Sequence, residues 1–302
     1  MKPLSRSVRS AVEGPSVGVY LVLVVESFMA SGTHIVAKVV VQAVQPVVVT
    51  LLRSVIAALA LGLVLVLRGR GISIERGDYL KVVLLGLLAV PVNQFLFLTG
   101  VRYTTPSNAA LLYATTPILV LVFSHWFRGE PLTRRKSVGV ALGFLGVVVV
   151  ILERGLDASM AYLRGNLIIC VAVLAWGLYT VFGRDLIRKY GPIETSALTL
   201  IVGAIAFLPI GGCVARDLPI GSLPEGAWWQ ILYLSLITSG ASYFLWYYAL
   251  GRMEAGKVAV FANLQPILTT ILAVILLGQD ITPAFVIGGS VAITGVAITQ
   301  YG

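Results

Sequence analysis

The sequence predicts an all-α polytopic membrane protein with ten transmembrane helices, arranged as two inverted five-helix repeats. Hydrophobic residues make up 58% of the 302 residues and charged residues only 12%, whereas about 25% of an ordinary soluble domain is charged. The apolar residues form runs of about 20 residues, which is the length that a helix needs to cross a bilayer. In addition, a set of glycine and proline positions recurs in the two halves of the chain.

The ten predicted spans are the apolar runs between clusters of glycine, proline and charged residues. They cover residues 17–39, 46–67, 79–100, 106–127, 136–152, 165–183, 194–215, 227–250, 257–277 and 283–301. The first run follows a basic start, but it is too long for a signal peptide and lacks a small-residue cleavage site. We therefore expect it to be a helix of the mature protein. The connections hold a dozen residues or fewer, so no soluble domain is expected between spans.

Lysine and arginine residues are distributed unevenly between alternate connections, and this predicts the orientation of the chain. With Met1 in the cytoplasm, sixteen of the 22 basic residues fall on cytoplasmic segments, five on external segments and one, Arg53, within a span. Cytoplasmic loops of membrane proteins carry such an excess, so we predict that both termini are cytoplasmic. The net charge of +9 therefore reflects topology. Without a polar domain that carries a basic patch, we expect no nucleic-acid partner.

Glycine and proline positions of one half recur in the other. A shift of 149 residues aligns Pro117 with Pro266, and it also aligns four further glycine and threonine positions. We therefore predict a first repeat over residues 1–156 and a second over residues 157–302, which together form one transmembrane domain. Five spans are an odd number, so the second repeat must enter the membrane upside down relative to the first. Inverted repeats of this kind build many secondary transporters.

Two titratable residues lie on one stripe of the first predicted span. Glu26 is near mid-membrane, where a carboxylate costs about 3 kcal/mol or more unless it finds a partner, water or a proton. His34 follows two turns later and titrates near neutral pH. Both are candidates for proton coupling, and Glu26 is also a candidate for binding a substrate amine. The alternative is a permanently protonated Glu26 that makes a structural hydrogen bond between helices.

Polar and aromatic residues at membrane depth mark the predicted substrate site. Amide and hydroxyl groups at such depth either bond neighbouring helices or line a cavity. Aromatic rings suit a neutral or zwitterionic substrate with an apolar side chain, or a cation held over a ring face. The predicted substrate-binding residues are Asn93, Gln94, Tyr113, Trp176, Tyr179, Tyr243, Trp246 and Asn263. We expect a central cavity lined by the first, third, fourth, sixth, eighth and ninth spans, with the fifth and tenth outside.

Small residues on the fifth and tenth predicted spans indicate close helix packing rather than a binding site. They leave a smooth face on each helix, which lets backbones approach. The residues are Gly139, Gly143 and Gly146 in the first repeat and Gly288, Ala292 and Gly295 in the second. Cys170 and Cys213 are interpreted as small buried hydrophobic residues, and the sequence leaves open whether they form a disulfide.

The sequence contains no convincing site for a cofactor, a metal or hydrolytic catalysis. Residues 251–257 have the spacing of a phosphate-binding loop, but Val258 replaces the magnesium-binding hydroxyl residue and a buried strand is missing. The two histidines, His34 and His125, lie on separate spans and form no metal or haem set. No carboxylate pair or Ser/His/Asp set is placed for hydrolysis. We therefore expect neither a cofactor nor a bound metal, and we do not expect an enzyme.

The order of certain residues in both halves is typical of one membrane-protein family. These residues are Gly32, Lys38, Pro46, Arg53, the run 103–110, Pro117, Gly129 and Glu130, and then Trp176, Gly177, Pro192, Ala255, Gly256, Asn263, Pro266 and Gly278. Over essentially its whole length the chain resembles the EamA-type branch of the drug/metabolite transporter superfamily. The family glutamate is present as Glu130, but its repeat partner is Gln279, followed by Asp280, so an ionic role shared by the two positions is in doubt.

This resemblance implies a secondary transporter that exports small metabolites across a bacterial-type inner membrane by alternating access. Relatives of this layout export amino acids, including aromatic ones, which makes an aromatic or other apolar amino acid the favoured substrate. Other metabolites and drug-like cations are the first alternative, and an intramembrane enzyme or a channel is the second. The sequence leaves open the transport direction, the choice between proton coupling and facilitated diffusion, and whether the chain forms a homodimer. The expected partners are a small-molecule substrate and the lipid bilayer.

Overall fold

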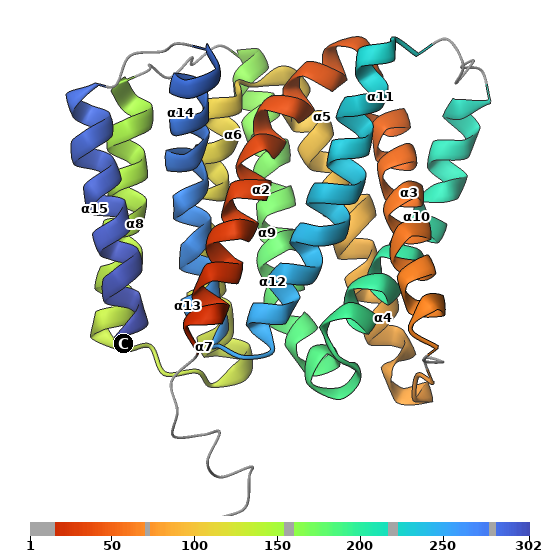
Figure 1. Cartoon of the computed structure of the whole chain (residues 1–302), viewed down its shortest axis with the longest axis horizontal. Coiled ribbons are helices and arrows are strands. Elements are labelled where there is room, and N and C mark those ends of the chain that lie inside the picture. Colours follow the sequence, from red (N-terminus) through yellow and green to blue (C-terminus); the bar gives the residue numbers. More distant parts are fainter. Residues whose placement is uncertain (1–15, 70–72, 154–159, 217–222, 278–281) are drawn as a thin grey trace, which may run out of the picture.

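The computed structural model is a bundle of long helices whose axes run roughly along one direction (Figure 1). It describes residues 16–69, 73–153, 160–216, 223–277 and 282–302, and no strand occurs among them. The elements of the first half are α2 (Val17–Ala43), α3 (Pro46–Leu67), η1 (Arg76–Asp78), α4 (Tyr79–Leu87), η2 (Leu88–Gln94), α5 (Phe95–Tyr103), α6 (Pro106–Tyr113), α7 (Thr116–Arg128) and α8 (Arg134–Glu153).

The second half has a similar series of helices, with a π-helical segment again in its third long stretch and a 3-10 segment, η5, before α14. Its elements are α9 (Met160–Tyr190), α10 (Pro192–Ala215), α11 (Glu225–Leu232), η4 (Tyr233–Ser242), α12 (Tyr243–Leu250), α13 (Ala255–Ala259), η5 (Val260–Asn263), α14 (Leu264–Leu277) and α15 (Pro283–Gln300). The predicted boundary between the repeats, at residues 156 and 157, lies outside the described residues. The predicted family positions Gly278, Gln279 and Asp280 also lie outside them.

Seven helical segments of the described chain are long and apolar enough to cross a membrane. They are Val17–Ala43, Pro46–Leu67, Arg76–Tyr103, Ala109–Arg128, Leu163–Tyr190, Pro192–Ala215 and Pro283–Gln300. The prediction of an all-α polytopic membrane protein is therefore confirmed. The other three predicted spans coincide with α8, with α11 to α12 and with α13 to α14, but they are not among the seven.

Proline residues fix several helix starts. Pro46, Pro192 and Pro283 are the first residues of α3, α10 and α15. The first turn of a helix tolerates proline because the N–H that proline lacks has no intrahelical acceptor there. Gly129 ends α7 with a φ of 64°, a left-handed conformation that glycine adopts without a steric penalty.

Helical irregularities occur at matching places in the two halves. η2, which contains Pro91, and η4 are π-helical segments, and they overlap when the sequence is shifted by 149 residues. The same shift places the break between α6 and α7 beside η5, which interrupts the helix between α13 and α14. Such breaks leave backbone groups without their usual partners, and membrane proteins tolerate them only inside the protein or beside a cavity.

The helices α8 and α15 pack closely and run antiparallel to each other. A Cβ atom added to Gly139 would lie 2.7 Å from the backbone nitrogen of Thr299, and one added to Gly146 would lie 2.5 Å from that of Ala292. Contacts therefore run forward along α8 and backward along α15. In Figure 1 the pair lies at one side of the bundle. The predicted packing role of the small residues on these two helices is confirmed.

Basic residues gather at the end of the bundle where α7 and α9 end, α8 begins and the C-terminus lies (Figure 1). We call this the basic end. Arg184 pairs there with Glu130, Arg128 with Asp185 at 2.5 Å and Lys136 with Glu254 at 2.5 Å. Two of these partners, Arg184 and Asp185, lie in the last two turns of α9, and this helix continues to Tyr190, beyond the predicted end of its apolar run at residue 183.

The two cysteines are not paired with each other. Both are free; Cys170 on α9 is half-buried and Cys213 on α10 is exposed. The interpretation of Cys213 as a buried residue is therefore wrong. The hydrophobic character that suggested burial is instead compatible with a helix surface turned toward lipid, because an apolar run cannot by itself distinguish lipid contact from protein contact.

Candidate functional site

A cavity of about 70 Å³ lies in the middle of the bundle, which is enough space for several water molecules. Its wall combines side chains from both halves of the chain. The residues that line it are Glu26, Ala30, Thr33, His34, Arg53, Asn93, Phe97, Tyr113, Trp176, Thr238, Ser242, Tyr243 and Gln265. They come from α2, α3, η2, α5 and α6 of the first half and from α9, η4, α12 and α14 of the second.

Two ionisable side chains that can carry opposite charges are buried in this wall. Glu26 on α2 is 2% exposed and Arg53 on α3 is 3% exposed, and neither forms an ion pair in the described part of the chain. Ser242 donates a hydrogen bond of 2.7 Å to Oε1 of Glu26, while the buried Oε2 atom has no partner among the described residues. Since an isolated charge is expensive at membrane depth, this carboxylate is suited to bind a cationic group or a proton.

Hydroxyl groups of η4 hold the Arg53 guanidinium. Its Nε donates to Oγ of Ser239 at 2.6 Å, and Nη2 donates to Oγ1 of Thr238 at 3.0 Å. These neutral acceptors orient the guanidinium but leave its charge uncompensated. The planar group can therefore still offer charge-assisted hydrogen bonds to a carboxylate in the cavity.

Asn93 connects the cavity wall to three other elements. Its Nδ2 donates to the hydroxyl of Tyr113 at 2.9 Å and to the carbonyl of Ala172 at 2.8 Å, and its Oδ1 accepts from the hydroxyl of Tyr243 at 3.2 Å. Both N–H donors and one of the two lone pairs of Oδ1 are used within the protein. Asn93 thus fixes the position of two aromatic walls more than it offers free groups to a ligand.

His34 packs against aromatic rings on its side of the cavity. Its ring makes edge contacts with Phe97 and Tyr113, both at 5.5 Å between centroids. Gln265 of α14 is its polar neighbour, while its Nδ1 is buried without a partner in the described chain. His34 therefore lies in an aromatic part of the cavity wall, which it forms together with Phe97 and Tyr113.

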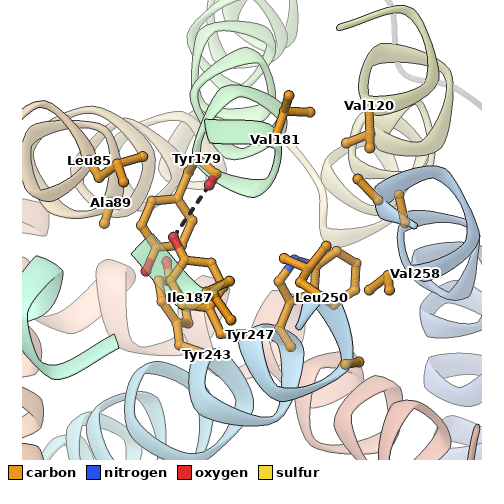
Figure 2. Packing of buried hydrophobic residues seen from close by; sticks show 14 of the residues in the cluster. Leu85, Ala89, Val120, Tyr179, Val181, Ile187, Tyr243, Tyr247, Leu250 and Val258 are labelled. Atoms are coloured by element: carbon orange, nitrogen blue, oxygen red, sulfur yellow. Dashed lines mark hydrogen bonds between the residues drawn. The ribbon is translucent and has the colours of Figure 1, made fainter. Parts of the chain in front are cut away.

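A stack of aromatic rings separates the cavity from the basic end. Trp176 and Tyr179 stack at 5.5 Å between centroids, and Tyr179 and Tyr247 stack at 4.8 Å. Figure 2 shows Tyr179, Tyr243 and Tyr247 together, with the hydrogen bond of 3.3 Å from the Tyr247 hydroxyl to the Tyr179 carbonyl. Tyr179, Trp246 and Tyr247 are fully buried, so this stack forms a floor beneath the cavity.

The structure brings six of the ten predicted site residues into the cavity wall. These are Glu26, His34, Asn93, Tyr113, Trp176 and Tyr243. The other four do not line it. Gln94 lies behind the wall, where its Nε2 donates to the Tyr243 hydroxyl at 3.4 Å, while Tyr179 and Trp246 belong to the floor. Asn263 is fully buried beside Gly143 of α8, with both side-chain polar atoms unpartnered among the described residues.

Other wall residues were not among those predicted to bind substrate. Arg53 had a signal, because it is the one basic residue in the interior of a predicted span rather than at its end, but a role as a helix clamp explained it equally well. Ser242 and Gln265 had a weaker signal, since the 149-residue shift aligns Ser242 with Asn93 and Gln265 with Thr116. The remaining wall residues are of kinds that are common in membrane helices and carry no signal: Ala30, Thr33, Phe97 and Thr238. Among the described residues, no group of three or more His, Cys, Asp or Glu side chains could hold a metal ion.

Comparisons with known proteins identify the family of the chain. The EamA-like transporter family matches residues 17–152 and 163–301. The uncharacterized transporter YyaM of Bacillus subtilis is 27% identical over 92% of this chain and 92% of its own length. An uncharacterized transporter of Archaeoglobus fulgidus is 30% identical over 84% of this chain and 88% of its own.

The fold also matches a solved structure. A crystal structure with 21% identity superposes with a TM-score of 0.77 and covers 93% of this chain and 95% of that one. This likeness supports the fold alone, while the sequence matches extend over nearly the whole length of the chain and of its relatives. The chain is therefore a multi-pass membrane transporter, not an enzyme, and it belongs to the EamA-like transporter family.

Proposed function

We propose that this protein is a secondary transporter that exports a small zwitterionic metabolite, an amino acid with an aromatic or other apolar side chain, across the plasma membrane. The observation that carries the proposal is the pair of buried, uncompensated opposite charges, Glu26 and Arg53, in one cavity. A free α-amino acid carries an ammonium and a carboxylate on the same carbon atom. Its ammonium would bind Oε2 of Glu26 and its carboxylate the Arg53 guanidinium, so that both buried charges are neutralised.

The aromatic wall supports an apolar or aromatic side chain on this substrate. Phe97, Tyr113 and Trp176 line the same cavity, and rings of this kind offer large apolar contact areas with defined edge and face geometry. Glu26 and His34 remain the candidates for proton coupling. If neither changes its protonation during transport, the protein works by facilitated diffusion along the substrate gradient.

Ten spans in two inverted repeats are part of this proposal. The seven apolar segments would be joined in the membrane by α8, by α11 to α12 and by α13 to α14, which gives five spans in residues 1–156 and five in residues 157–302. Packing between repeat counterparts supports the inversion. α8 packs antiparallel to α15, and in α3 and α10 the contacts of Leu51 with Gly211 and of Gly62 with Ile201 run in opposite directions.

Contacts at the cavity repeat in the same inverted sense. Asn93 of η2 donates to the carbonyl of Ala172 on α9, and its counterpart Ser242 of η4 donates to Glu26 on α2. The helices α9 and α2 are themselves counterparts in the two halves. Two halves with exchangeable conformations are what alternating access requires, because the exchange closes one side of the site and opens the other.

The basic end supports a conformation closed on its own side. Three ion pairs there link elements of the first half with elements of the second: Glu130 with Arg184, Arg128 with Asp185, and Lys136 with Glu254. The aromatic floor lies between these pairs and the cavity. Because cytoplasmic loops carry the excess of basic residues, we assign the basic end to the cytoplasm, together with both termini.

Ligand-induced stabilisation tests the proposed substrate class. We expect phenylalanine to raise the Tm of the purified protein, since a ligand at 100 times its Kd stabilises the folded state by about 2.7 kcal/mol. Phenethylamine lacks the carboxylate and 3-phenylpropionate lacks the ammonium. Each should therefore have a Kd at least tenfold higher than that of phenylalanine, and should raise the Tm less at equal concentration. Glu26→Gln should lose the response to phenylalanine, while Glu225→Gln, at an exposed position on α11, is the matched control.

The outcome also separates the alternatives. Equal stabilisation by phenethylamine and phenylalanine would overturn the zwitterion and favour the drug-like cations, since only the ammonium would then matter. Absence of stabilisation by every amino acid, with a response to sugars or nucleotides, would overturn the amino-acid substrate.

A further inference from the structure

A second cavity lies on the outer surface of the bundle and is separate from the central one. This groove has a volume of about 350 Å³ and lies between α4 and α9. Its lining is almost entirely apolar apart from two charged residues. The residues are Lys81, Leu84, Leu85, Leu87, Leu88, Leu178, Phe182 and Asp185. None of them lines the central cavity.

Helix packing explains why the groove exists. At Gly86, α4 approaches α10, where an added Cβ would lie 2.9 Å from the nitrogen of Gly203. At Gly100, α5 instead approaches α9, with an added Cβ 2.8 Å from the carbonyl oxygen of Gly165. The segment from α4 to α5 thus packs on α10 at Gly86 and on α9 at Gly100, and the groove lies between α4 and α9, with the buried Leu85 in its lining.

The groove enters the apolar layer from the membrane surface. Lys81 and Asp185 lie at its basic end, and Leu88 of η2 and Leu178 of α9 lie seven residues deeper along the chain, or about 10 Å at the rise of a helix. Leu84 and Phe182 are 51% and 37% exposed. In a protein that crosses a bilayer, an apolar opening of this depth beside a lipid-exposed helix faces acyl chains rather than water.

Two charges of opposite sign stand at the mouth of the groove. The side chain of Lys81 is 53% exposed and meets Asp78 at 3.3 Å, but Asp78 also accepts from Lys189 and Tyr190, so it neutralises Lys81 only in part. The side chain of Asp185 is 42% exposed. Its Oδ1 accepts from Arg128, while Oδ2 has no hydrogen bond within the described chain.

The geometry points to a phospholipid site, and we propose that the groove holds one acyl chain of a phospholipid whose headgroup carries a primary ammonium, as in phosphatidylethanolamine. The phosphate would pair with Lys81 and the ammonium would donate to Oδ2 of Asp185. One positive and one negative side chain match the signs of such a headgroup, in which a phosphate and an ammonium are separated by two carbons. A methylated choline ammonium has no N–H to donate, and phosphatidic acid has no cation for Asp185, so both should bind more weakly.

Native mass spectrometry of the delipidated full-length protein tests this site. Three lipids with the same acyl chains are added separately: phosphatidylethanolamine, phosphatidylcholine and phosphatidic acid. We expect the wild-type protein to bind one phosphatidylethanolamine at least tenfold more tightly than either of the other two. Leu84→Trp, which fills the groove, should abolish this tight binding. Leu63→Trp, which places the same bulk on an exposed leucine of α3 (58% exposed), should retain it.

Substitutions of the two charged residues distinguish their contributions to lipid binding. Lys81→Gln should weaken all three lipids, whereas Asp185→Asn should remove the preference for phosphatidylethanolamine over phosphatidylcholine. Equal binding of the three lipids to the wild-type protein would overturn the proposal, and this measurement requires no variant to fold. Tight binding that survives in Leu84→Trp would also overturn it. So would a dimer that disappears in Leu84→Trp, because the groove would then be a contact between two copies of the chain.

Discussion

At the scale of single residues, the unusual feature of the central cavity is that its two buried ionisable groups form no ion pair with described residues. Glu26 and Arg53 are almost completely buried, and each is held by hydroxyl groups rather than by the other. Hydroxyl hydrogen bonds orient a charge but do not cancel it, so these two groups carry an electrostatic cost that the proposed zwitterionic ligand would remove. The aromatic residues around the pair are held by Asn93, whose hydrogen bonds reach Tyr113 and Tyr243.

Removal of the Asn93 side chain should lower the free energy of unfolding. Asn93→Ala removes three hydrogen bonds, and at about 0.6 kcal/mol for an average bond within a membrane protein the free energy of unfolding should fall by about 2 kcal/mol. Tyr113→Phe removes one of these bonds and should cost about a third as much. Unfolding in mixed micelles with increasing amounts of a denaturing detergent measures the free energy of unfolding of both variants. Equal losses in the two variants would show that Asn93 does not act through this network.

The sequence predicts individual site residues when their chemistry is rare in a membrane helix. Glu26 and His34 were found because carboxylate and imidazole groups are expensive in apolar runs. Arg53 carried the same signal, but the sequence could not separate a helix clamp from a ligand-binding group. Gln94 was misleading because it is adjacent to Asn93 in the chain. Neighbouring residues of a helix point about 100° apart, and hydrophobic periodicity does not show which of two adjacent polar side chains faces a cavity.

At the scale of elements, close glycine contacts set how the helices pack. The contact of α8 with α15 depends on Gly139, Gly146 and Gly295, where backbone atoms occupy the space of a Cβ. These helices contribute no residue to the wall of the central cavity. Their packing therefore belongs to the stability of the bundle, and changes there should leave substrate binding largely intact.

Substitution of Gly146 should separate stability from affinity. Gly146→Ala places a Cβ against the backbone of Gly288 and Ala292, and overpacking of this kind costs about 1–3 kcal/mol. Gly212→Ala on α10 is the matched control, because nothing lies within 4 Å of its added Cβ; alanine is favoured over glycine within a helix by about 1 kcal/mol. We expect a lower Tm for Gly146→Ala only, with KM unchanged in both. A raised KM in Gly146→Ala would connect α8 to the site.

Most helices were predictable because each apolar run has the length of a bilayer crossing. The run at 227–250 matches α11 to α12 closely, although its tyrosine, tryptophan and serine residues lower its mean hydropathy. The end of α9 was missed by about two turns. The charged residues Arg184, Asp185 and Lys189 ended the predicted run, but ion pairs with other elements let the helix continue past the apolar region.

At the scale of the whole molecule, the two ends of the bundle are held differently. Ion pairs between the halves close the basic end, whereas at the far end Lys38 of α2 donates to the carbonyls of Val101, Arg102 and Thr104 within its own half. Ion pairs that span the halves must break if the basic end is to open. The proposed export therefore requires a cavity that takes up its ligand with the basic end open and releases it at the far end with the basic end closed.

Counterflow in proteoliposomes tests this central claim most directly. Vesicles loaded with unlabelled phenylalanine are diluted into a trace of labelled phenylalanine, and a carrier with one alternating site must accumulate the label transiently above its equilibrium level. We predict a saturable overshoot for the wild-type protein and for Glu225→Gln, and at least a tenfold lower initial rate for Glu26→Gln and Arg53→Gln. Uptake that neither saturates nor overshoots, or that both cavity variants retain in full, would contradict the account.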